Sequence, residues 1–462
     1  MDAGMNAFTQ ELMRRSPLAS CVLELCDFMF SDELLTSIWD EHRGRCYEDQ
    51  LRFADLLELM RDALTRHRGS AHKLFVELER RDAQPVDESN FYRKLARTPV
   101  ALSRALLREG TAKLAALMPA DAVTLPACFD RYAVIVGDGK KVKDAAKRLA
   151  PTRGFSGKLI GAKALVALDV RSGLAVAMSD SLDGLTNDVP LVPLLMPQLR
   201  QIIERPILSV WDRQFGDLRT FGHLTARAGD AFVVRASRSQ AVFTAETVVK
   251  TADAKGRVVI DEIGIMGRGS SARPMRRITL VRDGEAEDDV VLLTNLLDRA
   301  AFCAADLLAL YKERWGIERV FQQVTETFSL SHLIGSSPKA VLLQLAFCLL
   351  LYNLMQLVKA FVAQDGGVLA SVVSMFYLFD DTRKELEAWA YHGQGQWTRT
   401  RRDDASMRER LRELLKGSWN PVAYTKASDK HPRPKPPPKR LLHGGHSSVQ
   451  RLLEGKIKLA NT

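Results

Sequence analysis

Cysteine is scarce in this sequence, and the few thiols form no pattern that would bind a metal or build a disulfide framework. The 462 residues include six cysteines, which are Cys21, Cys26, Cys46, Cys128, Cys303 and Cys348. No pair of cysteine or histidine residues completes a zinc-binding spacing. The scattered positions are typical of reduced, mostly buried thiols in a cytosolic protein.

The sequence also lacks an export signal, internal repeats and an uninterrupted membrane span. Residues 1–16 contain no long apolar stretch and no cleavage-site pattern, so we expect a cytoplasmic protein. Residues 341–358 are strongly apolar, but Gln344, Asn353 and Gln356 interrupt them. This pattern favours a buried core helix over a helix that crosses a membrane.

Positive charge is in excess in an otherwise ordinary composition. The net charge is +10 and the isoelectric point is near 9.3, while apolar residues make up 46% and charged residues 26% of the chain. The length has room for roughly three domains, or for one large core with additions. A basic chain fits a polyanionic partner such as DNA, and with it an association with the nucleoid. Many basic proteins, however, bind no nucleic acid.

The first part of the chain, residues 1–125, is predicted to be helical. One predicted helix, residues 89–97, follows a turn at Pro85 and carries Arg93, Lys94 and Arg97. Such a basic helix could enter a DNA groove in the manner of a helix-turn-helix protein. A solvated helix face that contacts no DNA is the alternative for this segment.

From residue 126 the pattern changes to an α/β fold. Short apolar runs predict strands at 133–137, 163–170, 174–178, 206–211 and 231–235, with helices at 187–200 and 216–228. Strands and turns then alternate over 237–297, which predicts a β-rich insertion, and helices return over 298–360. A weakly helical region (361–424) precedes a basic, Pro-rich tail (425–462). We expect this tail to be unstructured and either to contact phosphates or only to aid solubility.

One predicted helix, residues 311–325, carries the most informative polar stripe. At about 100° per residue, Tyr311, Arg314, Glu318 and Thr325 fall within an arc of roughly 60°. The apolar residues lie on another side, which indicates an amphipathic helix that packs by one face. A carboxylate can hold a divalent metal, and a neighbouring arginine and tyrosine can bind phosphate. The stripe therefore suggests chemistry on a nucleic-acid backbone.

Two aspartates occupy equivalent positions, because Asp138 and Asp212 each follow an apolar strand. Functional groups collect at strand ends in α/β sheets. With Glu318, three carboxylates could converge, and such an anionic cluster makes sense only around metal ions. Two Mg²⁺ ions about 4 Å apart would be the expected complement.

Each acid also has an ordinary interpretation: a turn residue for Asp138, a partner of Arg213 for Asp212, and a surface salt bridge for Glu318. Basic residues beside the acids are what a phosphate-binding cleft needs, and they are Lys140, Lys141, Lys143, Arg213 and Arg314. Three further aspartates lie in a predicted loop and are less well directed; they are Asp180, Asp183 and Asp188.

These motifs resemble the DDE transposases of bacterial insertion sequences. The similarity is to the subgroup named for insertion sequence four, with its signature Y-x2-R-x3-E-x6-K, and it covers roughly residues 125–360. The resemblance implies an RNase H-like core interrupted by a β-rich insertion. It also implies Mg²⁺-dependent cleavage at transposon ends, with Mn²⁺ as a substitute, followed by attack of the 3′-hydroxyl on target DNA. A homodimer on double-stranded DNA is the implied assembly.

Site residues follow from the same resemblance. Asp138, Asp212 and Glu318 would be the catalytic metal ligands, and Tyr311 and Arg314 would contact phosphates of the end DNA. The helices of residues 1–125 would recognise the terminal inverted repeats. Neighbouring basic residues are expected to bind DNA as well, namely Lys140, Lys141, Lys143, Arg213, Arg319, Arg93, Lys94 and Arg97.

Two departures from the family pattern bear on mechanism. Thr325 stands at the lysine position of the signature, so either Arg319 or Lys339 substitutes or the contact is weaker. The only tryptophan between Asp212 and Glu318 is Trp315, which leaves a hairpin intermediate without an evident stacking residue. A nuclease without strand transfer and a DNA-binding protein with a decayed site are the alternatives. The presence of all three acids counts against decay.

Overall fold

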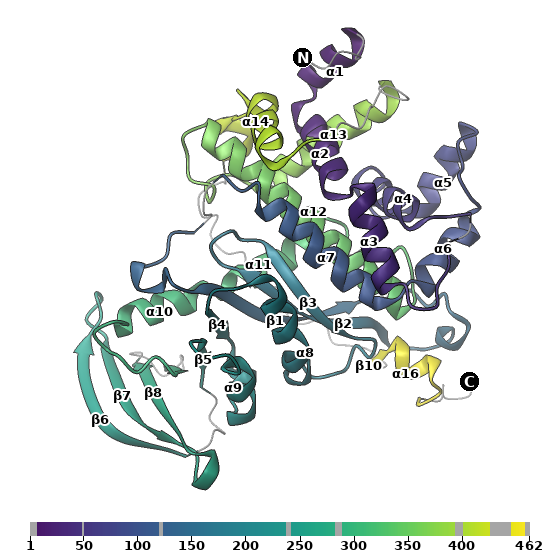
Figure 1. Cartoon of the computed structure of the whole chain (residues 1–462). Helices are drawn as coiled ribbons and strands as arrows, with labels where there is room; N and C mark the ends of the chain where they lie inside the picture. Colours follow the sequence, from purple (N-terminus) through teal and green to yellow (C-terminus); the bar gives the residue numbers. More distant parts are fainter. Residues whose placement is uncertain are drawn as a thin grey trace.

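A single mixed β-sheet runs through the centre of the computed structural model, which describes residues 7–48, 50–119, 123–236, 242–281, 289–392, 401–425 and 445–457. The sheet has ten strands in the order β10-β2-β1-β4-β5-β9-β8-β7-β6, and β3 pairs with β2. Helices cover both faces of its central part (Figure 1). The bounds of the five central strands are β1 Ala133–Lys143, β2 Lys158–Asp169, β3 Ala175–Ser181, β4 Ile207–Trp211 and β5 Ala231–Arg235.

Alternation along β1 explains why the sheet is covered on both faces. Val134 and Val136 belong to one apolar cluster, and Ala133 and Ile135 belong to another. The first cluster includes helices α7, α11 and α12, and the second includes α8 and α9. Both clusters are buried, so a nearly continuous apolar run forms the strand. The bounds of these helices are α7 Val100–Ala115, α8 Val192–Ile202, α9 Leu218–Leu224, α11 Trp315–Glu326 and α12 Pro338–Asp365.

Strand directions divide the centre of the sheet into two halves. Strands β3, β2 and β1 pair in antiparallel fashion, whereas β1, β4 and β5 run parallel. The parallel register aligns Val136 of β1 with Val210 of β4. The predicted strands at 163–170, 174–178, 206–211 and 231–235 are confirmed within a few residues, whereas β1 is much longer than the predicted 133–137.

The predicted β-rich segment also forms strands, and they extend the same sheet. Its strands are β6 Phe243–Ala252, β7 Val258–Met266, β8 Arg273–Leu280 and β9 Val290–Thr294. Strand β9 pairs with β8 on one side and with β5 on the other. Figure 1 shows β6, β7 and β8 reaching away from the helices that cover the centre. The division of the chain into domains stays a prediction.

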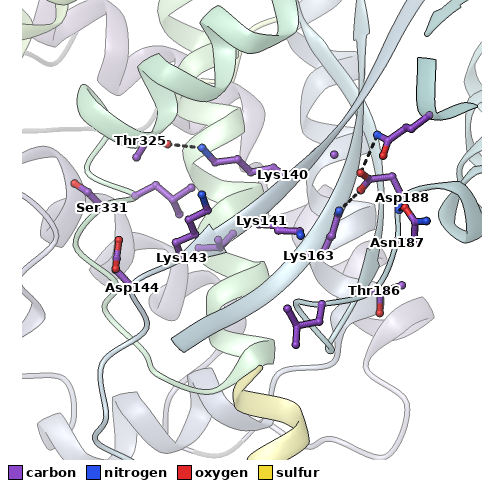
Figure 2. Close-up of a pocket in the computed structure, with 15 residues that line it drawn as sticks. Lys140, Lys141, Lys143, Asp144, Lys163, Thr186, Asn187, Asp188, Thr325 and Ser331 are labelled. Atoms are coloured by element: carbon purple, nitrogen blue, oxygen red, sulfur yellow. Dashed lines mark hydrogen bonds and ion pairs between the residues drawn. The ribbon is translucent and has the colours of Figure 1, made fainter. Parts of the chain in front are cut away.

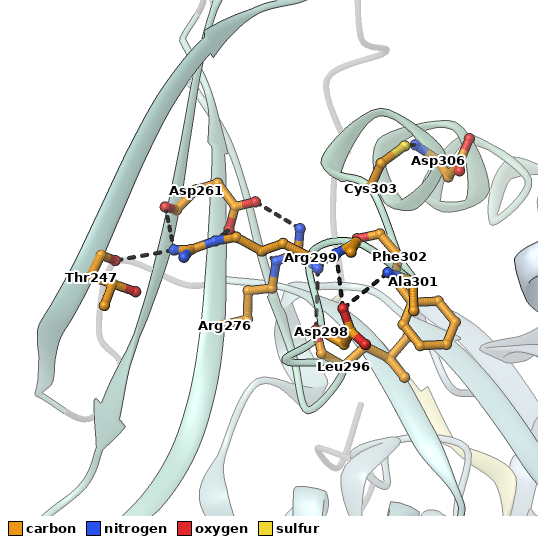
Figure 3. A network of polar contacts seen from close by, with 11 residues as sticks. Thr247, Asp261, Arg276, Leu296, Asp298, Arg299, Ala301, Phe302, Cys303 and Asp306 are labelled. Atoms are coloured by element: carbon orange, nitrogen blue, oxygen red, sulfur yellow. Dashed lines mark hydrogen bonds and ion pairs between the residues drawn. The ribbon is translucent and has the colours of Figure 1, made fainter.

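A buried arginine ties these outer strands to the chain that leads into α10 (Ala304–Lys312). Arg276 of β8 makes two hydrogen bonds to the carboxylate of Asp261 on β7, with Nε–Oδ1 at 2.9 Å and Nη2–Oδ2 at 2.7 Å. Its Nη1 donates to the carbonyl oxygens of Leu296 and Phe302. Arg299 also pairs with Asp261, so two guanidinium groups share one carboxylate (Figure 3).

The N-terminal helices are α1 Ala7–Arg15, α2 Pro17–Met29, α3 Asp32–His42, α4 Phe53–Thr65, α5 Ala71–Arg80 and α6 Glu88–Arg97, followed by α7. Helix α7 packs against α12 and β3, and α6 also contacts α12. The basic helix α6 begins at Glu88, one residue before the predicted Ser89, and Asp87 stands at the N-cap position.

The apolar stretch predicted as a core helix is the centre of α12. By length and composition α12 could cross a membrane, but 94% of its most apolar window is buried inside the protein. Gln344 and Asn353 make hydrogen bonds to groups outside the helix. Asn353 accepts from the Ala175 amide and donates to the Ala175 carbonyl and the Thr111 hydroxyl, each at 2.8 Å. These bonds explain how polar side chains can interrupt a buried helix.

The C-terminal region differs in part from the expectation of an unstructured tail. Helices α13 Met375–His392, α14 Asp404–Leu415 and α15 Pro421–Tyr424 precede it. The Lys- and Pro-rich run of residues 426–440 lies outside the described residues. Farther on, β10 (His446–Ser448) pairs with β2, and α16 (Val449–Leu453) packs against the same strand. The sheet edge at Lys158–Ile160 supplies the backbone partners that fix this segment.

A buried carboxyl on α13 predicts a pH-dependent stability. Burial raises the pKa of Glu385 to about 7, and its carboxyl accepts the Ala19 amide of α2 at 2.9 Å. A folded-state pKa above the ordinary value means that the native state binds more protons than the unfolded chain between about pH 4.5 and 7. The contribution of Glu385 to stability is therefore full at low pH and decreases as the pH rises through this window.

We expect Glu385→Gln to remove that decrease. Urea unfolding at pH 5 and pH 8 should show the variant gaining stability relative to the wild type at the higher pH. Glu387→Gln on the same helix is the control, because its side chain is 45% exposed and pairs with Arg383. Parallel pH profiles for the wild type and Glu385→Gln would contradict the assignment.

Candidate active site

The fold places two aspartates at the same level of neighbouring parallel strands. Asp138 lies two residues beyond Val136 on β1, and Asp212 lies two residues beyond Val210, directly after β4. Strand alternation points both side chains toward the face that carries α11 and α12. Asp138 does not end its strand as predicted. β1 continues to Lys143, because the long antiparallel partner β2 supplies backbone hydrogen bonds as far as that residue.

A glycine next to the first aspartate is required by packing. A Cβ atom added at Gly137 would lie 2.0 Å from the ring of Trp211, which is fully buried across the neighbouring strand. The indole can lie against β1 only because residue 137 has no side chain. Gly137 and Trp211, each directly before an aspartate, thus pack against each other across the two strands that carry the site.

The two aspartates share a partly buried environment with incomplete charge compensation. Burial, helped by the nearby charge of Asp212, raises the pKa of Asp138 to about 6, although the hydrogen bond from the Gly139 amide and the charge of Arg314 act to lower it. Burial also raises the pKa of Asp212. Each carboxylate accepts one backbone N–H, from Gly139 at 2.8 Å and from Gln214 at 2.9 Å. A site that holds two such carboxylates favours a bound cation.

The polar stripe predicted on one helix is divided between two. Helix α10 ends at Lys312 and α11 begins at Trp315, so Tyr311 and Glu318 lie on separate helices. At the junction, the Arg314 amide bonds to the Tyr311 carbonyl and the Gly316 amide to the Glu313 carbonyl, a three-residue spacing that tightens the turn. The prediction of one continuous helix was wrong at this point.

Arg314 is the cation that connects the three acids in this structure. Its Nη1 donates to Glu318 Oε1 at 2.8 Å, and its charge also acts on Asp138 and Asp212. The guanidinium packs near the rings of Tyr311 and Trp315, with centroid distances of 5.8 and 4.6 Å. Tyr311 is buried, so only a small part of it faces solvent.

The donor set of the three acids suits a hard divalent cation, since all are carboxylate oxygens. Within the described residues, however, no three His, Cys, Asp or Glu side chains converge closely enough to hold a metal ion. Asp138 and Asp212 fit such an ion by position and uncompensated charge. Glu318 fits only after its carboxylate leaves Arg314, because Arg314 occupies it here.

Beside the aspartates lies a lysine-rich pocket of about 740 Å³ (Figure 2). Lys140, Lys141 and Lys143 of β1 line it, as expected for phosphate contacts, together with Lys163 of β2, which the sequence analysis missed. Among the described residues, no carboxylate pairs with Lys140, Lys141 or Lys143. Asp144 also lines the pocket, but it pairs with Lys158, which does not.

Lys140 brings its charge to the helix position where the predicted signature lysine is missing. Its Nζ donates to the Thr325 hydroxyl at 2.7 Å and to the Phe321 carbonyl at 3.3 Å. Arg319 and Lys339 were the substitutes expected from the sequence. The structure instead places the ammonium group of a residue 185 positions away against Thr325.

The remaining predicted DNA-binding residues lie in two places. Arg213 and Arg319 are exposed, one directly after Asp212 and the other directly after Glu318. Arg93, Lys94 and Arg97 of α6 line a different pocket of about 370 Å³ with Trp39. Lys94 donates to a backbone carbonyl of the loop after α3 and lies 4.4 Å from the Trp39 ring centroid, which holds it against the protein.

Comparison with known proteins decides the family. The transposase DDE domain matches residues 117–354, which is more than half of the 462-residue chain. The chain belongs to the DDE transposase family. All three acids lie inside the matched range. The subgroup named for insertion sequence four stays a prediction.

Two transposases illustrate the similarity. A Sinorhizobium fredii (strain NBRC 101917 / NGR234) protein named "Putative transposase y4zB" is 35% identical over 114 residues, which are 24% of this chain and 30% of that relative. The chain thus spans less than a third of the relative's length. The solved structure of a piggyBac transposase synaptic complex with hairpin DNA is 13% identical, and 85% of each chain aligns with a TM-score of 0.41.

Three residues that surround the aspartates of this DDE transposase were not predicted from the sequence. Asp188 was placed in a loop and set aside, and neither Lys163 nor Gln214 was considered. In the structure, Asp188 is buried, pairs with Lys163 and accepts a hydrogen bond from Gln214. No local pattern marks these residues, since they come from three distant segments and meet only after folding.

Proposed function

We propose that this protein is a DNA transposase that cuts at the inverted repeats of transposon ends and joins the 3′-hydroxyl ends to target DNA. The observation that carries the proposal is the pair Asp138 and Asp212, level on neighbouring parallel strands, beneath the helix that bears Glu318. Membership of the DDE transposase family supports the same reading. Antiparallel β3, β2 and β1 beside parallel β4 and β5 support an RNase H-like core.

Asp138, Asp212 and Glu318 are the proposed ligands of Mg²⁺, with Mn²⁺ as a substitute. When bound, divalent cations would activate a water or a 3′-hydroxyl and stabilise the leaving oxygen. Side chains of the protein would position the cations and bind the phosphate. The two aspartates fix the position of the charge from a rigid sheet, and Arg314, once parted from Glu318, presents a guanidinium to a phosphate with Tyr311 behind it.

The lysines of β1 are proposed to bind the DNA backbone next to the acids. Lys140, Lys141 and Lys143 carry charges that no described carboxylate neutralises, in a pocket that begins one residue after Asp138. Phosphates are the natural partners of such a row. The exposed Arg213 and Arg319, and Arg93, Lys94 and Arg97 of α6, would add contacts, and two copies would act on a pair of ends.

The deciding experiment uses a supercoiled plasmid that carries the DNA flanking this reading frame. With Mg²⁺, the wild-type protein should cut at the inverted repeats and join the freed ends to a second DNA. Cutting without joining would favour a nuclease of related fold. Retardation of the DNA without any cutting would favour a binding protein with a decayed site.

Lys140 offers a sharp test of the phosphate pocket. We expect Lys140→Met to weaken binding to end DNA several-fold at physiological salt. The slope of log K against log salt should fall by about 0.9, because one fewer phosphate is neutralised. Fluorescence anisotropy across a salt series would measure both. Lys384→Met is the control, since that lysine pairs with Asp380 and Asp381 on α13.

An exchange variant tests the position of the charge. Lys140→Thr/Thr325→Lys would place an ammonium group at the same spot from the helix side, so it should recover most of the affinity that Lys140→Thr alone loses. An unchanged salt slope for Lys140→Met would exclude the proposed contact, whatever the catalytic activity.

A further inference from the structure

A buried ion pair lies directly behind the two aspartates. Asp188, between β3 and α8, contacts Lys163 of β2 with Oδ1–Nζ at 2.5 Å, and the side chains are only 8% and 4% exposed (Figure 2). Burying two charges costs several kcal/mol before their attraction repays it. A buried pair is therefore weak evidence for stability, and its position needs another explanation.

The Asp188 carboxylate contacts both segments that carry the catalytic aspartates. Its Oδ2 accepts the side-chain amide of Gln214 at 2.9 Å, and the backbone amide of the same Gln214 donates to Asp212. On the other strand, a Cβ atom added at Gly139 would lie 2.0 Å from Oδ1 of Asp188. The backbone amide of Gly139 donates to Asp138. One carboxylate thus touches the residue that holds each aspartate.

Lys163 makes this contact possible without adding a free negative charge. Asp188 already acts unfavourably on the ionised forms of Asp138 and Asp212, because all three carry the same charge. The ammonium group of Lys163 neutralises Asp188, and Gln214 engages its second oxygen. Both oxygens of Asp188 are thus engaged by protein groups, and Asp188 lies as a spacer between the two catalytic segments.

We infer that Asp188 is a positioning residue of this active site, and that the Lys163–Asp188 pair sets the separation of Asp138 and Asp212 that a divalent cation requires. The inference rests on the proposed function of the two aspartates. Gly139 takes part by leaving room for the carboxylate, and Gln214 by linking it to Asp212. Residues that orient ligands in this way commonly change metal affinity by about 10- to 100-fold when replaced.

The experiment measures Mn²⁺ binding to the full-length protein by isothermal titration calorimetry, separately from catalysis. Asp188→Asn/Lys163→Met removes both buried charges with little change in volume, so it avoids an unpaired buried charge. We expect Mn²⁺ to bind about 10- to 100-fold more weakly and the Mg²⁺ concentration for half-maximal cleavage to rise by a similar factor.

Asp183→Asn is the matched control, because Asp183 lies in the same loop and pairs with Arg451 away from the acids. Gln214→Met should weaken Mn²⁺ binding in the same direction. When Gln214→Met is combined with Asp188→Asn, the total loss of Mn²⁺ affinity should be smaller than the sum of the two separate losses. Both substitutions remove the same contact, the hydrogen bond between Gln214 and Asp188. If Asp188→Asn/Lys163→Met folds and binds Mn²⁺ with wild-type affinity, the inference is overturned.

The two proposals fail in different ways. If the wild type binds Mn²⁺ but never cuts DNA, the proposed function fails, and the positioning role is still judged by the calorimetry. If the wild type cuts DNA and the variants keep its Mn²⁺ affinity and Mg²⁺ dependence, only the positioning role fails.

Discussion

Asp138→Asn is expected to lower the rate of DNA cleavage by about 10³-fold or more, and Asp212→Asn and Glu318→Gln are expected to do the same. A loss of that size is about 4 kcal/mol of transition-state stabilisation, which is reasonable for removing a proposed metal ligand. Affinity for end DNA should persist, because the lysines that line the neighbouring pocket are unchanged. Cleavage of an end-bearing plasmid and anisotropy with the same end DNA would measure the two effects.

Stability separates this loss of activity from a failure to fold. Burial raises the pKa of Asp138 to about 6, so its ionised form opposes folding at pH 8. Asp138→Asn should therefore be at least as stable as the wild type at that pH.

The control is Asp180→Asn on β3. Burial also raises the pKa of Asp180 to about 6, but Asp180 pairs with Arg104. Full cleavage by the Asp138→Asn variant, or equal loss in the Asp180→Asn control, would contradict the site.

The largest expected effect on stability comes from the buried pair of β7 and β8 (Figure 3). Asp261→Asn removes the only carboxylate that the described residues offer to the fully buried Arg276. Leaving a buried guanidinium without its partner costs about 3–5 kcal/mol. Chemical denaturation of the wild type and the variant would measure this difference in the free energy of unfolding.

The adjacent pair on the same two strands is a close control. Glu262 and Arg277 are one residue along each strand, and the arginine side chain is 33% exposed. Glu262 is 12% exposed, but water reaches Arg277, so Glu262→Gln should cost less than Asp261→Asn. Arg276→Met/Asp261→Leu should recover most of the stability, because apolar residues of similar volume replace the whole pair. Equal losses for Asp261→Asn and Glu262→Gln would show that burial does not govern these pairs.

Much of the fold could be predicted from local pattern. Strands β4 and β5 and the buried helix α12 follow from apolar runs that are long enough to identify by themselves. Strand β1 was cut short because Gly137 and Gly139 around Asp138 look like a turn. Its continuation depends on pairing with β2, which local sequence cannot show. The break between α10 and α11 was missed for a similar reason, since the apolar spacing continues through Glu313 and Arg314.

The residues of the candidate site likewise fall into those that local sequence could predict and those that it could not. Asp138, Asp212 and Glu318 could be selected because each stands at a recognisable point of a strand or helix. Asp188, Lys163 and the contact of Lys140 with Thr325 could not, because each depends on segments that meet only in three dimensions. A buried charge has no sequence signature until its partner is known.

The pairing of β9 with β5 has a mechanical consequence. Val233, Val234 and Arg235 lie opposite Thr294, Leu293 and Leu292 in an antiparallel pairing, so the outer strands share one backbone ladder with β5, the strand beside β4. The outer strands could move independently of the central sheet only if the pairing of β5 with β9 were broken. Any nucleic acid bound by these outer strands would therefore keep a constant orientation relative to Asp212.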